Sequence, residues 1–132
     1  MSDNSADLSP AAIAVAFTQA WTNHDMENAA RYLTKDVTFH GPLQQSNGIE
    51  EYLTGLAAFA RAVTGMRVLA ALGDDEQALI MYEVTTGPFG TLTCAEHLTF
   101  RNGKIVADRL TFDTYAVRMT QANQSNNRPA GS

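Results

Sequence analysis

The sequence predicts an α+β domain in which three helices in the N-terminal part cover a strongly curved, mainly antiparallel sheet. Helical periodicity runs through most of the chain up to residue 63. After Gly65 the pattern changes to four stretches rich in β-branched and aromatic residues. Turn sequences separate these stretches, which cover residues 66–72, 78–86, 91–101 and 104–115. Helices first and a meander second are typical of helices packed on one face of a sheet.

The first half of the chain contains three predicted helices and one short strand. Ser9, as an N-cap before a proline, begins a helix that runs to about His24. A second helix is expected at 26–33 and a third, amphipathic helix at 49–63. A short strand is expected at 37–40. We expect the third helix to cover the sheet.

The last two strands surround Arg101-Asn102-Gly103, the strongest hairpin signal in the chain. Glu96 and Asp108 fall on mainly apolar faces of these strands, because alternate residues share a face. A three-residue loop at 101–103 would place Glu96 opposite Asp108 and make an acid pair. A strict two-residue turn would place Glu96 opposite Arg109 and make an ordinary ion pair. The sequence leaves both alternatives open.

The length of 132 residues fits one domain. Residues 1–8 are polar and are expected to be flexible, and residues 119–132 are too polar to bury a face and are expected to form a disordered tail. The domain itself is therefore placed at 9–118.

Composition argues against several classes of partner. The net charge is −5 and the nine Lys and Arg residues are scattered, so we expect no nucleic acid partner. No apolar run is long enough to span a membrane, and the single cysteine, Cys94, and the polar first residues favour the cytoplasm. The sequence lacks a glycine-rich phosphate loop and ligand-spaced histidines, so we expect neither a nucleotide cofactor nor a metal.

The words WTNHD, LTKDVTFHGP, GPFG and FRNGKIVADRLTFD, in this order, resemble the SnoaL-like branch of the nuclear transport factor 2-like superfamily. The resemblance covers roughly residues 9–115. It implies a cone, that is, a strongly bent sheet wrapped around a pocket that helices close. It also implies a homodimer joined through the sheet.

The resemblance extends to ketosteroid isomerases only in part. Their general-base Asp stands immediately before a proline, where this chain has Gly41, with His40 one residue earlier. Their second acid falls on the position of Glu96, and the place of their oxyanion-hole Tyr, around Phe17, has no hydroxyl. At most one of the three functional positions is therefore kept, and His40 is a candidate for the missing base.

Two other enzyme types of the superfamily give weaker matches. The Asp-Arg-Asp positions of limonene epoxide hydrolases are taken by Glu83, Thr85 and Leu110, so that triad is absent. The acid/base Asp of SnoaL-type polyketide cyclases has its nearest counterpart in Asp108, two residues before the matching place.

The sequence therefore predicts a pocket for a small apolar molecule, with two groups of candidate residues. An acid pair in a poorly hydrated pocket would raise one carboxyl pKa and allow cofactor-free acid/base chemistry on a ketone or epoxide, as in an isomerase, cyclase or hydrolase. A non-catalytic binding or dimerisation domain is the alternative. The catalytic candidates are Glu96, Asp108, His40 and Glu83. Core residues that also line the pocket are expected to be Phe17, Trp21, Tyr52, Leu56, Phe59, Met81, Cys94, Leu98, Leu110 and Phe112.

Overall fold

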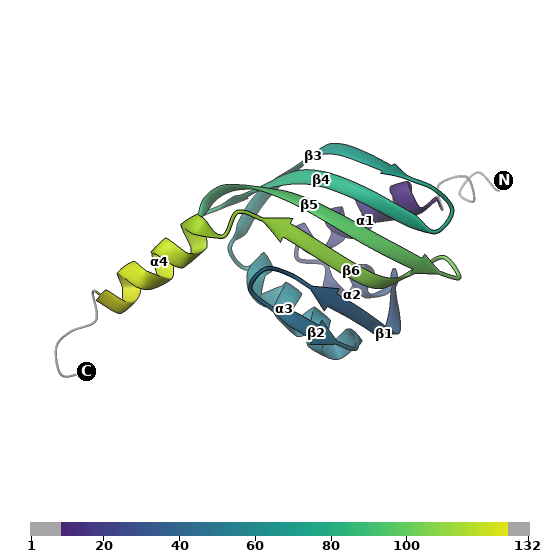
Figure 1. Ribbon diagram of the computed structural model, residues 1–132, viewed down its shortest axis with the longest axis horizontal. Coiled ribbons are helices and arrows are strands. Elements are labelled where there is room, and N and C mark those ends of the chain that lie inside the picture. Colours follow the sequence, from purple (N-terminus) through teal and green to yellow (C-terminus); the bar gives the residue numbers. More distant parts are fainter. Residues whose placement is uncertain (1–8, 127–132) are drawn as a thin grey trace.

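The computed structural model describes residues 9–126, in which helices lie against the concave side of one curved sheet (Figure 1). The predictions for residues 1–8 and 127–132 fall outside this range. The elements in chain order are α1 (Pro10–Thr22), α2 (Met26–Ala30), β1 (Leu33–His40), β2 (Gln45–Asn47), α3 (Ile49–Ala60), β3 (Val63–Gly73), β4 (Gln77–Thr86), β5 (Gly90–Arg101), β6 (Lys104–Phe112) and α4 (Tyr115–Asn126).

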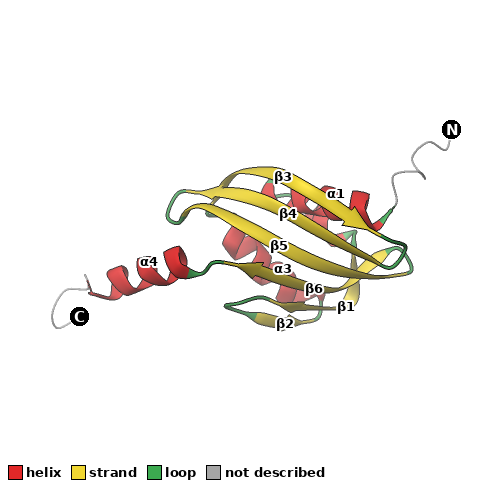
Figure 2. Ribbon diagram, turned by 45° about the horizontal axis from the view of Figure 1, so that its top comes forward, coloured by secondary structure: helices red, strands yellow, loops and turns green. Residues whose placement is uncertain are grey.

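The sheet has six strands in the order β2-β1-β6-β5-β4-β3, and the predicted α+β class is confirmed. Neighbouring strands are antiparallel except β1 and β6, which are parallel. Bulges in β3 and β6 add to the twist, which bends the sheet over the helices (Figure 2). The sheet does not close, and its shape is roughly that of a cone.

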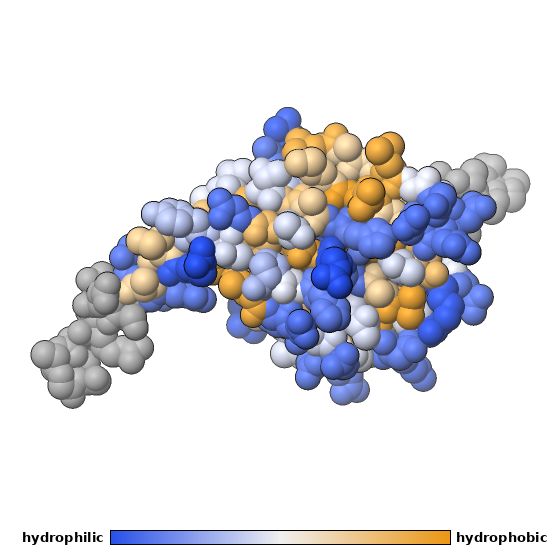
Figure 3. All heavy atoms as spheres, in the orientation of Figure 1, coloured by the Kyte–Doolittle hydropathy of each residue, from blue (hydrophilic) through white to orange (hydrophobic). Residues whose placement is uncertain are grey.

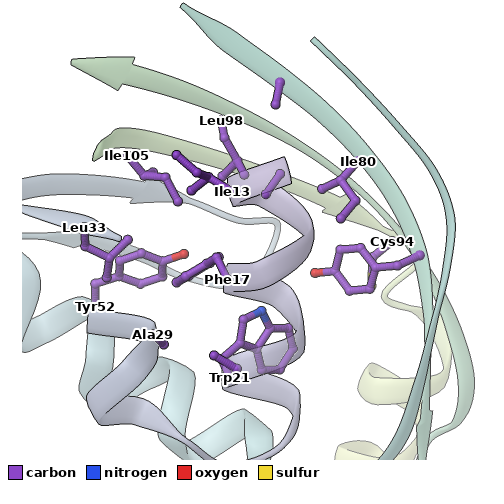
Figure 4. Packing of buried hydrophobic residues seen from close by; sticks show 14 of the residues in the cluster. Ile13, Phe17, Trp21, Ala29, Leu33, Tyr52, Ile80, Cys94, Leu98 and Ile105 are labelled. Atoms are coloured by element: carbon purple, nitrogen blue, oxygen red, sulfur yellow. The ribbon is translucent and has the colours of Figure 1, made fainter. Parts of the chain in front are cut away.

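Helix α1 fills the concave side of the sheet. The Ser9 side chain caps it by accepting a hydrogen bond from the backbone N–H of Ala12 at 3.2 Å. Ile13, Phe17 and Trp21 are buried along one face, as the periodicity predicts. Figure 4 shows these side chains in the same packed cluster as Ile80, Leu98 and Cys94 of the sheet. The core therefore lies between α1 and the concave face.

Two helices end earlier than predicted because strand pairing takes residues that the helical pattern included. The second helix ends at Ala30 rather than at 33, since Leu33 pairs with Ile105 of β6. The third helix ends at Ala60 rather than at 63, since Val63 already pairs with Thr86 of β4. The short strand β2 was not predicted, and it completes the sheet beside β1.

The chain continues as a helix where a disordered tail was expected from residue 119. Helix α4 follows Asp113, whose carboxylate accepts a hydrogen bond from the backbone N–H of Tyr115 at 2.9 Å. Val117 is buried and ties the start of the helix to the body of the domain. Figure 1 shows the rest of α4 projecting away from the sheet. No helix in the range 9–126 is long and apolar enough to cross a membrane.

Candidate functional site

The turn between β5 and β6 is the two-residue type. Arg101 pairs with Lys104, and Asn102 and Gly103 both have positive φ, 54° and 80°, as a type I′ turn requires. The pairing then shifts by one residue between Thr99 and Phe100, so that Val106 of β6 is left as an extra residue. A turn and a bulge together set the register of the hairpin.

The two-residue turn excludes Asp108 as the residue opposite Glu96, and the bulge excludes Arg109, so both expected partners are wrong. Glu96 stands opposite Leu110, and Asp108 stands opposite Leu98. Since Leu98 shares a strand face with Glu96, the two acids lie on the same side of the sheet as diagonal neighbours. Both are buried, with 4% of Glu96 and 2% of Asp108 exposed. The acid pair therefore forms, by a register that the turn sequence alone does not give.

Two buried tyrosines bind the two acids. Tyr82 of β4 donates its hydroxyl to Glu96 Oε1 at 2.7 Å. Tyr52 of α3 donates its hydroxyl to Asp108 Oδ2. The ring of Tyr52 is stacked on Phe39, with centroids 5.2 Å apart, which holds the hydroxyl in place. The arrangement is a row of four polar groups inside an otherwise apolar core.

Burial sets the protonation of this row. It raises the pKa of Asp108 well above the ordinary aspartate value, and the negative charge of Glu96 raises this pKa further. The hydrogen bond from Tyr52 acts in the opposite direction. Asp108 Oδ1 is also buried without a hydrogen-bond partner among the described residues, which is costly for a charged oxygen. Asp108 therefore keeps its proton to a higher pH than an exposed aspartate.

The tyrosines and the cysteine beside the acids are poor nucleophiles for the same reason. Burial, followed by the charge of the adjacent carboxylate, raises the pKa of Tyr52 and of Tyr82 well above the usual tyrosine value. Burial also raises the pKa of Cys94 to about 12. All three side chains are therefore protonated near neutral pH, and the two hydroxyls act as hydrogen-bond donors.

A cavity of about 690 Å³ opens next to the acids. Tyr52, Tyr82 and Glu96 supply buried polar groups to its wall, whereas Asp108 lies behind this wall. Most of the remaining wall is aromatic or aliphatic, a composition typical of small-molecule sites. These apolar residues include Trp21, Phe39, Leu43, Leu56, Phe59, Phe89, Leu110, Phe112 and Val117.

The sequence carries the signature of a known family over most of this structure. A model of the SnoaL-like domain matches residues 14–107, which run from within α1 into the start of β6. Glu96 lies inside this range, and Asp108 is the first residue after it. The chain belongs to the SnoaL-like family. No curated protein sequence matches this SnoaL-like chain.

Solved structures place the SnoaL-like chain within the wider nuclear transport factor 2-like fold. A protein from Kribbella flavida is 30% identical with a TM-score of 0.82, over 87% of this chain and 95% of that one. A nuclear transport factor 2-like protein of unknown function from Cytophaga hutchinsonii is 16% identical with a TM-score of 0.69, over 81% of this chain and 92% of that one. A steroid delta-isomerase from Pseudomonas aeruginosa is 15% identical with a TM-score of 0.69, over 89% of this chain and 91% of that one.

Two of the predicted site residues lie on the wrong side of the sheet. On β4, alternation buries Ile80, Tyr82 and Val84 in the core and turns Met81 and Glu83 to the opposite, outer face. Glu83 forms an ion pair there with Arg67 at 3.0 Å, and Met81 is exposed. The assignment of these two residues to the pocket was wrong, because the sequence does not say which face of β4 is concave.

The remaining predicted residues divide between the cavity and its surroundings. His40 is exposed at the end of β1 and does not line the cavity, although its neighbour Gly41 does. Phe17 and Leu98 are fully buried in the core and do not line it either. The predicted ligand-binding residues that line the cavity are Trp21, Tyr52, Leu56, Phe59, Cys94, Leu110 and Phe112.

Sequence reasoning missed Tyr82 and the acid-binding role of Tyr52. Tyr82 stands opposite Cys94 in the β4–β5 pair, so its strand face is that of Glu96. Its alternation with Ile80 and Val84 is a signal that could have found it. Tyr52 meets Asp108 from a helix 56 positions earlier in the chain, a contact that no local pattern reveals.

Acidic and sulfur ligands do not gather into a metal site in the described part of the chain. No group of three or more His, Cys, Asp or Glu side chains between residues 9 and 126 is placed to hold a metal ion. The buried polar side chains at the cavity include Glu96 and the two tyrosines, with Asp108 behind them.

Proposed function

We propose that this SnoaL-like chain holds a small, mainly apolar organic molecule in its cavity and transfers a proton to or from it without a cofactor. One observation carries the proposal: Glu96 is buried, lines the cavity, accepts a hydrogen bond from Tyr82 and has Asp108 as its diagonal neighbour in the sheet. A carboxyl group in apolar surroundings needs a partner or a function, and this one has access to a ligand.

The two acids can take different roles because their surroundings differ. Asp108 lies behind the cavity wall and its pKa is raised, so it is the member of the pair that is suited to hold a proton, whereas Glu96 faces the cavity. Glu96 can then accept a proton from a carbon next to a ketone, or activate water for attack on an epoxide. The hydroxyls of Tyr52 and Tyr82 lie in the same wall, and each can donate to an oxygen that gains negative charge once it gives up its hydrogen bond to Asp108 or Glu96. Isomerisation, cyclisation and hydrolysis all use such groups.

The likeness to the steroid delta-isomerase supports the reaction class only by analogy of fold. The general base of ketosteroid isomerases has no counterpart at Gly41, and exposed His40 does not line the cavity. The proposal therefore assigns the base to Glu96 and leaves His40 without a role in the reaction.

The test is hydrogen exchange at carbon. The purified protein is incubated in deuterium oxide with a panel of cyclic and polycyclic ketones, and proton NMR follows loss of the signal next to the carbonyl. We expect accelerated exchange for at least one ketone and a reduction of about 100-fold or more in Glu96→Gln. Glu83→Gln, the same change on the outer face, should leave the rate unchanged. Equal rates in Glu96→Gln and the native protein would contradict the assignment.

A non-catalytic binding protein is the second candidate, and one observation favours it. Glu96 Oε1 already accepts a hydrogen bond from Tyr82, and Asp108 does not reach the cavity. Such a wall can orient a ligand without turnover. A thermal-shift screen of ketones, epoxides and polycyclic aromatics separates the two candidates, since stabilisation without exchange or hydrolysis supports binding alone.

We also propose that two copies associate through the outer face of the sheet. Large apolar side chains are exposed there: Leu72 is 70% exposed, Leu79 57% and Met81 45%. Figure 3 shows hydrophobic side chains gathered at the top of this face, over the region of β3 and β4. An exposed cluster of large apolar side chains marks an interaction surface, and a second copy of the chain would cover it.

Light scattering tests the association. The native protein should have the mass of a dimer at micromolar concentration. Leu79→Lys should shift it to a monomer, whereas Thr54→Lys on the exposed face of α3 should not. A monomeric native protein would rule the dimer out.

A cytoplasmic location stays a prediction from the single cysteine and the composition.

A further inference from the structure

The charged side chains of the cavity wall differ in sign: the buried one is acidic and the one at the rim is basic. Glu96 is the acid of the wall and is almost fully buried. The exposed residues of the wall include Gln44, Arg61 and Gln121, which places them at the opening. Arg61 is the basic residue among the lining side chains. The cavity thus has a carboxyl end inside and a cationic group at its mouth.

Arg61 has no carboxylate partner within the described chain. The ion pairs found between residues 9 and 126 join Arg67 to Glu83 and Arg101 to Asp36. Arg61 follows directly after α3, where a cation is favoured by the helix dipole, and this by itself explains a basic residue at that position. It does not explain why the guanidinium borders an apolar cavity whose other polar groups are neutral or acidic.

Resting on the proposed small-molecule function, we infer that the ligand is an organic acid, with an apolar body in the cavity and an anionic group bound by Arg61 at the mouth. A guanidinium binds a carboxylate or sulfonate well because its N–H groups match two acceptor oxygens. The reverse orientation would bring the anion next to Glu96, where like charges repel in surroundings of low dielectric. The charge pattern therefore fixes which end of the ligand enters first.

This orientation has a consequence for the proposed chemistry. With its acid group held at the mouth, the ligand presents its opposite end to Glu96 and the tyrosine hydroxyls. A ketone or other neutral oxygen at that end would reach the groups that transfer protons, several bonds away from the anion. Neutral molecules of the same shape fit the cavity but lack the contact with Arg61.

A matched pair of fluorescent probes tests the inference. Anilinonaphthalene sulfonate and its parent amine, phenyl-naphthylamine, share one apolar body and differ in the sulfonate. Titration of the native protein should give tighter binding of the sulfonate. Arg61→Gln should weaken sulfonate binding by about fivefold and leave binding of the amine unchanged. Arg61→Lys should restore part of the loss, because it keeps the charge without the planar fork.

Two controls locate the binding. Arg31→Gln removes the same charge from an exposed position that does not line the cavity, and it should not alter the affinity for either probe. Ala58→Trp places a large ring on an exposed lining position of α3 and should weaken both probes, while Thr54→Trp, exposed on the same helix but outside the lining, should weaken neither.

The possible results test the anionic ligand and the proposed small-molecule function separately. A fivefold loss confined to the sulfonate and to Arg61→Gln supports the inference. Equal sulfonate affinity in Arg61→Gln and Arg31→Gln, or binding of the amine alone, overturns the anionic ligand but leaves the apolar cavity as a binding site. Failure of both probes to bind the native protein, or binding unaffected by Ala58→Trp, overturns the proposed small-molecule function and this inference with it.

Discussion

Glu83 and Glu96 lie on adjacent strands of one sheet, yet their surroundings have almost nothing in common. Glu83 is on the outer face, where Arg67 neutralises it at the surface. Glu96 is on the concave face, 4% exposed, with a tyrosine hydroxyl and a second acid as its neighbours. The two carboxyl groups are chemically identical. Which face of the strand carries the residue decides whether it is a paired surface charge or a buried carboxyl group beside the cavity.

The same contrast applies to packing, and it gives the largest expected effect. Ile80 and Met81 are consecutive residues of β4, one 2% exposed and the other 45% exposed. Ile80→Ala should lower the free energy of unfolding by about 2–5 kcal/mol, because it leaves a cavity under the sheet. Met81→Ala should lower it by about 0.5 kcal/mol or less in a monomeric background such as Leu79→Lys. Urea denaturation measures both changes in the free energy of unfolding. Similar losses in the two variants would contradict the assignment of Ile80 to the buried face and Met81 to the outer face of β4.

Asp108 makes stability depend on pH with a definite sign. Its pKa is raised in the folded protein, so between the ordinary aspartate pKa and the raised one the unfolded chain loses this proton while the native protein keeps it. The contribution of this group to the free energy of unfolding therefore falls as pH rises through that window, by up to about 1.4 kcal/mol per pH unit.

The matched variants isolate this contribution. Asp108→Asn should show a flatter pH profile above about pH 4, the ordinary pKa range. Asp36→Asn should leave the decrease in the free energy of unfolding with rising pH in place, because Asp36 is exposed and the hydrogen bond from Arg101 lowers its pKa. Urea denaturation at a series of pH values is the measurement. If the free energy of unfolding depends on pH in the same way in Asp108→Asn and in the native protein, a raised pKa at Asp108 is excluded.

The smallest expected effect is at the outer-face ion pair. Glu83→Gln removes a contact between two partly exposed side chains and should cost about 0–1 kcal/mol, less at high salt. The double-mutant cycle with Arg67→Gln measures it. A coupling of several kcal/mol, insensitive to salt, would mean that Glu83 is as strongly held as the acids of the core.

The sequence predicts the elements of this fold better than it predicts how they pair. Hydrophobic periodicity and turn residues locate α1, α3 and the four long strands, because these signals are local. The register of β5 with β6 depends on a bulge at Val106, which has no strong local signature and moves Glu96 from Asp108 or Arg109 to Leu110. The acid pair could therefore be suspected from the sequence, but not its geometry.

The candidate site shows the same division between local and distant information. Alternation places Glu96, Cys94 and Leu98 on one face, and the structure agrees. Alternation also groups Met81 with Glu83, but the side of the sheet that α1 covers is a matter of tertiary packing. The contact of Tyr52 with Asp108 joins a helix to a strand far along the chain. Helix α4 was missed because its composition is polar and one buried residue, Val117, anchors it.

The central claim is that a protonated acid lies behind Glu96 in the wall of the cavity. Carbon-detected NMR of the side-chain carboxyl groups tests it directly, by following the carboxyl carbon of each acid from pH 3 to pH 8. We predict that Asp108 ionises at a clearly higher pH than exposed aspartates such as Asp74, whose pKa is lowered by hydrogen bonds, first of all from the backbone N–H of Glu76. An Asp108 midpoint near the ordinary value of about 4 would contradict it.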